Sequence, residues 1–120
     1  MFREDYLMRQ IEMMTVMMAR ILFRKDAPRY ELPEFSRDYN EADYLHLQLL
    51  SLLGQGKIQE AEAILFDALD GKNMRALDIA LDFYSRANEF GDEYLAGRGV
   101  TREELEKHLQ KAVDLYGITL

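Results

Sequence analysis

Residues 3–24 contain neither glycine nor proline, and their apolar side chains recur at alternating spacings of four and three. That spacing places the side chains on one face of an α-helix, in a heptad-like seam. The residues of this seam are Leu7, Ile11, Met14, Met18 and Ile21. The pattern therefore predicts one long amphipathic helix, whose seam must be covered either by the same chain or by another.

The rest of the chain repeats helical periodicity between clear start and stop signals. Helices are predicted over 40–53, 57–70 and 74–89, followed by a last helix that ends near Tyr116. Asn40 and Asn73 suit N-cap positions, and Thr101 with Glu104 three residues later forms a capping-box pattern. Residues 92–99 allow at most one helical turn. Because no convincing strand is found, we expect an all-α fold of about five helices.

Both prolines lie in one segment between the first two predicted helices. Proline disfavours helix in the residue before it, so residues 25–39 read as an ordered or semi-ordered linker. The sequence thus predicts an N-terminal helix over 1–24, this linker, and a helical bundle over 40–117. A proline-containing linker would let the first helix stand apart from the bundle.

Composition and charge narrow the function classes. A chain of 120 residues, 48% apolar and 31% charged, fits one soluble domain. It has no cysteine, which excludes disulfides and thiolate metal sites and suits a reducing cytoplasm. The net charge is −7, which argues against nonspecific nucleic-acid binding. The first 25 residues carry +2, so the remaining 95 sum to −9.

The N-terminus has neither a signal-peptide pattern nor a membrane span. Acidic residues in "MFRED" occupy the place of a basic leader region. The most apolar run, 13–23, covers eleven residues, well below the roughly 20 needed to cross a bilayer.

Residues 54–69, "GQGKIQEAEAILFDAL", carry a second pattern. Gly56, Ala61 and Ala68 stand at the turn and small-residue positions of the second helix of a tetratricopeptide repeat, which this stretch resembles. An offset of 33 residues aligns Asn40 with Asn73, but "LAGRGV" then interrupts the second copy. This likeness implies one repeat-like helical hairpin and a diverged second one, rather than a repeat array.

Three further segments extend the comparison to most of the chain. They are "DYLMRQIE" at 5–12, "ADYL" through "GKIQEAE" at 42–62, and residues 92–105, where Thr101 takes a serine place. Together they resemble an uncharacterised bacterial family of short all-helical proteins, a domain of unknown function. The resemblance supports the fold and implies no activity.

Candidate chemical sites are few, and we predict no catalytic, cofactor-binding or metal site. His46 follows Asp43 by three residues, a spacing that can aim two ligands at one metal, but a second such pair is missing. We expect His46 to be a partly exposed helix-face residue. Asp78 and Asp82 are flanked by Arg75 and Arg86, which favours a solvated, salt-bridged face.

The function favoured by the sequence is a cytoplasmic interaction or scaffold protein without a cofactor. The methionine-rich seam of the first helix, Leu7 to Ile21, predicts a homodimer interface. Two alternatives remain open. The same helix can bind a membrane surface, or an enzyme site can form between subunits. That site would draw on four residues, namely Asp43, His46, Glu104 and His108.

Overall fold

The computed structural model describes residues 2–118 and is all-helical over that range. Six α-helices and one short 3-10 helix follow each other along the chain. They are α1 (Phe2–Phe23), η1 (Ser36–Asp38), α2 (Glu41–Gly54), α3 (Ile58–Ala68), α4 (Met74–Ala87), α5 (Asp92–Gly97) and α6 (Arg102–Leu115). The all-α prediction is confirmed. The segment predicted to form at most one turn is a six-residue helix, α5.

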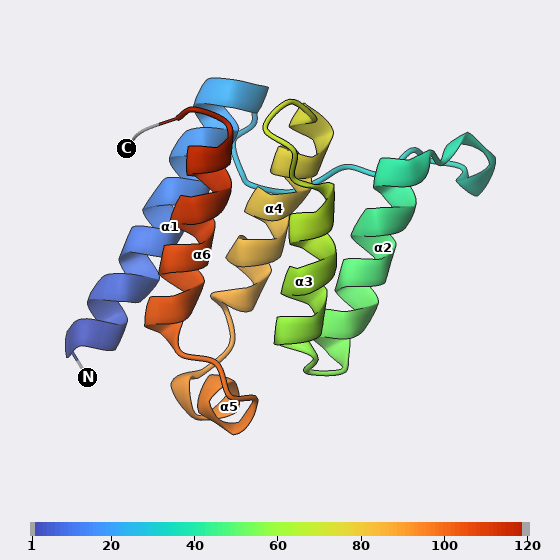
Figure 1. The fold of residues 1–120 in the computed structure, drawn as a ribbon. Coiled ribbons are helices and arrows are strands. Elements are labelled where there is room, and N and C mark those ends of the chain that lie inside the picture. The colour runs from blue at the N-terminus through green and yellow to red at the C-terminus, as the bar shows by residue number, and fades with distance from the viewer. Residues whose placement is uncertain (1, 119–120) are drawn as a thin grey trace.

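Helix α4 is the centre of the fold. It contacts α1 and α6 on one side and α2 and α3 on the other, and the helices stand roughly side by side in Figure 1. Ten of its fourteen residues are buried. The two adjacent apolar stripes of this helix have the breadth that contact with several neighbours requires.

Three helix starts follow the caps that the sequence predicts, at Asn40, Asn73 and Thr101, and the first and third of these are capping boxes. The Asn40 side chain accepts a hydrogen bond from the Asp43 backbone N–H, and the Asp43 carboxylate accepts one from the Asn40 N–H. Thr101 and Glu104 make the same reciprocal pair at the start of α6. Each capping box satisfies two backbone donors that a helix start would leave free.

The segment between α1 and α2, residues 24–40, is called the strap. It runs behind α4 in the view of Figure 1 and is fastened to that helix by polar contacts. Lys25 Nζ lies 2.8 Å from Asp78 Oδ2, and the Tyr30 backbone N–H donates to Asp82 Oδ2 at 2.8 Å. The linker is thus fixed to α4, and the first helix does not stand apart as expected, because it packs against α4 and α6.

A buried arginine holds α5 and α6 to the end of α4. Arg102 is 2% exposed, and its guanidinium donates to the backbone carbonyls of Asn88 and Phe90, each at 2.8 Å. It also pairs with Asp92 Oδ1 at 2.7 Å. Burial of a guanidinium is tolerated because these acceptors replace the water it loses.

Candidate functional site

The seam predicted as a dimer interface lies mostly inside the chain. Four of its five residues are 7% exposed or less, namely Leu7, Ile11, Met14 and Met18. They face α4 and α6, which pack against α1. Only Ile21, at 64% exposed, reaches the surface. Four of the five seam residues therefore belong to the core of the folded chain, and in this fold only Ile21 of the seam is available for contact with another copy.

The opposite side of α1 is exposed and carries its own apolar row. Its members share one helix face, at spacings of seven, four and four residues. They are Tyr6, Met13, Met17 and Ile21, exposed by 61%, 52%, 39% and 64%. Three exposed arginines accompany them, namely Arg9, Arg20 and Arg24. We call these seven residues the α1 outer face.

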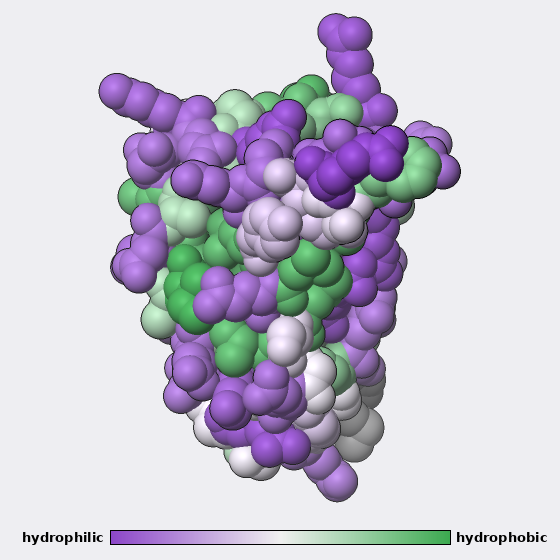
Figure 2. All heavy atoms as spheres, turned by 90° about the vertical axis from the view of Figure 1, so that its right-hand side faces the viewer, coloured by the Kyte–Doolittle hydropathy of each residue, from purple (hydrophilic) through white to green (hydrophobic). Residues whose placement is uncertain are grey.

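A second exposed apolar face lies on α2, at the other edge of the molecule. Tyr44 is 58% exposed, and Leu47 and Leu50 are partly exposed. We call these three residues the α2 outer face. Figure 2 looks at this side and shows hydrophobic side chains across its middle, with hydrophilic ones above and below. Residues 44–56 contain no Asp, Glu, Lys or Arg, and their one histidine, His46, is 3% exposed.

The inner side of α2 is fixed by a polar cluster beneath the strap. Tyr30 donates its phenolic hydrogen to Asp43 Oδ1 at 2.6 Å, and burial raises the pKa of Tyr30 to about 12. Burial alone would raise the pKa of Asp43, but the hydrogen bonds from Tyr30 and Asn40 outweigh it and lower that pKa. The rings of Tyr30 and His46 lie 4.9 Å apart. His46 is therefore a core residue rather than a partly exposed one, and burial lowers its pKa.

The acidic pair on α4 is also more buried than the sequence suggested. Asp82 is 0% exposed and accepts from Arg86, while Asp78 is 9% exposed and accepts from Lys25. The expected Asp82–Arg86 pair exists, but the solvated face does not. Within residues 2–118, Asp78 Oδ1 has no hydrogen-bond partner. Burial raises the pKa of Asp78, and the Lys25 contact opposes that shift.

The residues named for an inter-subunit enzyme site are engaged separately. Glu104 caps α6, and the other α6 residue, His108, lies with its Nδ1 2.7 Å from Glu62 Oε2. The same carboxylate oxygen accepts from the buried Tyr84 hydroxyl at 2.6 Å. This tie between α3, α4 and α6 had no local sequence signal, because Glu62 is 46 residues from His108. Among the described residues, no group of three or more His, Cys, Asp or Glu side chains could hold a metal ion.

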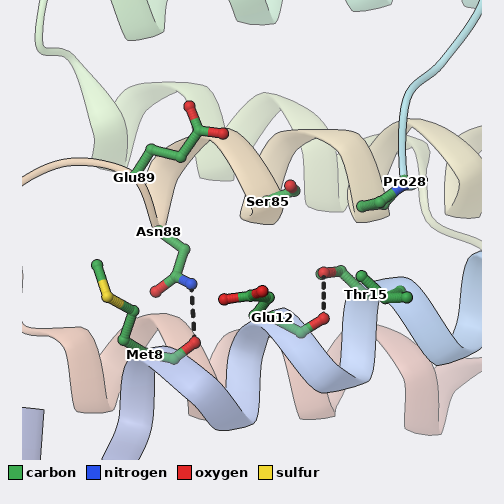
Figure 3. Close-up of a pocket in the computed structure, with 8 residues that line it drawn as sticks. Met8, Glu12, Thr15, Pro28, Ser85, Asn88 and Glu89 are labelled. Carbon is green, nitrogen blue, oxygen red and sulfur yellow. Dashed lines mark hydrogen bonds between the residues drawn. The ribbon is translucent and has the colours of Figure 1, made fainter. Parts of the chain in front are cut away.

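A cavity of about 320 Å³ lies between α1 and α4, and Figure 3 shows its lining. Three of its polar side chains already make hydrogen bonds within the chain. The Asn88 side-chain amide donates to the Met8 carbonyl at 2.9 Å, and the Thr15 hydroxyl donates to the Glu12 carbonyl at 3.0 Å. Glu89, at its rim, accepts from Arg29. The Asn88 bond joins α1 to the C-terminal end of α4, so we interpret this cavity as part of the contact between these two helices.

The described residues therefore form a small helical protein with two exposed apolar faces. The chain belongs to a family of unknown function, DUF6483, whose model matches residues 1–117. This confirms the resemblance to an uncharacterised family; the tetratricopeptide likeness of residues 54–69 stays a prediction. Neither a curated protein nor a solved structure matches the chain.

Proposed function

We propose that this protein is a small interaction module that self-associates through the α2 outer face. The single observation that carries the proposal is the absence of Asp, Glu, Lys and Arg from residues 44–56, in a chain that is 31% charged. The centres of protein interfaces are depleted in charged residues and enriched in tyrosine and other aromatics. Tyr44 provides such an aromatic, and Leu47 and Leu50 provide aliphatic area beside it.

The fold presents this face in a defined position. The opposite side of α2 is anchored by Leu49 and Leu53 in the core and by Asp43 under the strap. A rigid helix loses little conformational entropy when it binds, so more of its contact energy is left for affinity.

Two-fold symmetry favours α2 over α1 for contact between copies. In a symmetric dimer, the same patch meets itself. The α2 outer face then places no like charges against each other. The α1 outer face would bring the exposed Arg9, Arg20 and Arg24 of both copies to one interface, where like charges oppose association.

The test is the oligomeric state of a charged variant at each face. Leu47→Glu with Leu50→Glu is expected to give a monomer in equilibrium sedimentation at concentrations where the unmodified chain is a dimer. The matched control is Met13→Glu with Met17→Glu, which adds the same charge to the α1 outer face and should leave the dimer intact. A monomeric unmodified chain at high micromolar concentration, or a dimer lost only in the control, would contradict the proposal.

The absence of cysteine from all 120 residues also supports a reducing compartment such as the cytoplasm as the place of action.

A further inference from the structure

The α1 outer face carries cations that the chain itself does not neutralise. Within residues 2–118, Arg9, Arg20 and Arg24 make no ion pair, and all three are exposed. Met13 and Met17 lie between them on the same face. An exposed row of apolar side chains accompanied by arginines is the composition of a helix that lies in a membrane interface.

The long, narrow shape of this face suits contact with a lipid surface. From Tyr6 to its end at Phe23 the helix runs roughly 26 Å, and with a diameter of about 10–12 Å it presents a ridge of roughly 300 Å². A soft lipid surface takes a narrow ridge along its whole length, and it needs no matching groove.

The charge distribution gives the molecule a preferred orientation on a negative surface. The first 25 residues sum to +2 and the remaining 95 to −9. An anionic surface therefore attracts the arginines of α1 and repels the acidic body, which turns α1 toward the surface. None of the described helices is long and apolar enough to cross a membrane, so contact would be at the surface only.

We propose that the α1 outer face docks on anionic lipid headgroups. In this arrangement Arg9, Arg20 and Arg24 contact the phosphate level, and Met13, Met17 and Ile21 enter the boundary with the acyl chains. The α2 outer face lies at the opposite edge of the molecule (Figure 1), so lipid contact and self-association use separate surfaces.

Vesicle flotation tests the proposal with the full chain. The probes are vesicles of phosphatidylcholine alone and vesicles in which part of it is replaced by phosphatidylserine. The full chain should float with the phosphatidylserine vesicles at low salt and remain below with pure phosphatidylcholine. The variant with Arg9→Gln, Arg20→Gln and Arg24→Gln should bind on the order of 100-fold more weakly.

The matched control replaces three exposed arginines elsewhere, Arg37→Gln, Arg75→Gln and Arg98→Gln, and changes the net charge equally. It should float like the unmodified chain. A second variant, Met13→Ser with Met17→Ser, keeps every charge and should also bind more weakly, because it removes the apolar contact. An equal loss of vesicle binding in both arginine variants would mean that net charge alone explains the binding, and would overturn the proposal. So would failure of the unmodified chain to float, or loss of the dimer in the α1 variant.

Discussion

The outer faces of α1 and α2 are both exposed and both apolar, but they differ in charge. The α1 outer face combines Tyr6, two methionines and Ile21 with three arginines, whereas the α2 outer face has no charged residue. Apolar content alone would predict the same kind of partner for both faces. Charge separates them, because an uncharged patch can meet its own copy and a basic patch needs a negative counterpart.

The largest expected effect is a difference in the free energy of unfolding between substitutions on the buried side and on the exposed side of α1. Ile11→Ala, at a residue 0% exposed, should lower the free energy of unfolding by about 3 kcal/mol, since it leaves a cavity against α4 and α6. Met13→Ala, on the outer face, should change it by less than about 0.5 kcal/mol. Urea denaturation of the two variants measures both values. Equal losses would mean that the outer face is also covered in solution.

A smaller effect is expected where the strap holds α2. Tyr30→Phe leaves the buried Asp43 Oδ1 without its phenolic donor, and should cost about 2 kcal/mol of unfolding free energy. The pKa of Asp43 is lowered in the folded chain, so the stability this carboxylate contributes is present above its ordinary pKa and is lost as the pH falls through the lowered one.

Thermal unfolding of the unmodified chain and Tyr30→Phe, followed from pH 7 downward, tests this. The difference between them should shrink at pH values below the ordinary carboxyl pKa of about 3.9. A difference that does not depend on pH would show that the bond does not require the charged carboxylate. Tyr39→Phe is the control, since the Tyr39 hydroxyl is outside the Asp43 contact.

Salt should affect the two faces differently. Raising the salt concentration screens exposed charges, so vesicle binding through the α1 outer face should weaken several-fold. Self-association through the α2 outer face should be unchanged or slightly stronger, because it depends on apolar contact. Sedimentation and flotation across the same salt series measure both. A dimer that dissociates as salt rises would place charged residues in its interface.

The smallest effect is expected at Gln10, beside the α1 outer face. Its side-chain amide donates to the Tyr6 hydroxyl at 2.9 Å on an exposed surface. Gln10→Ala should change the free energy of unfolding by less than about 0.5 kcal/mol. Chemical denaturation provides the measurement. A larger loss of unfolding free energy would mean that the exposed Gln10–Tyr6 hydrogen bond helps to stabilise the fold.

Local signals predicted most of the fold. The capping pairs at Asn40 and Thr101 and the breadth of the apolar face on α4 each depend on residues within a few positions of one another. Such patterns identify where helices begin and which side is buried. They do not identify what covers that side. The seam of α1 has the same spacing whether α4 and α6 or a second chain packs on it, and this is why the spacing alone did not predict that α4 and α6 cover it.

The candidate surfaces were only partly readable from the sequence. The uncharged run from Tyr44 to Gly56 is visible in the letters alone, but which of its leucines face outward is decided by the packing of α2 on α3 and α4. The strap was missed for a related reason. Lys25 and Asp78 are 53 residues apart, so their contact depends on the tertiary fold and leaves no local pattern.

The contact between α1 and α6 has a consequence for how the chain is made. The first helix leaves the ribosome long before α4, and α6 follows later still. Until α4 and α6 emerge, the helices that bury Ile11, Met14 and Met18 in the folded protein are missing. The nascent chain therefore exposes an apolar, aggregation-prone helix face that is buried in the folded protein. Chaperone contact with this chain should therefore concentrate on α1 and end once α6 is free to dock.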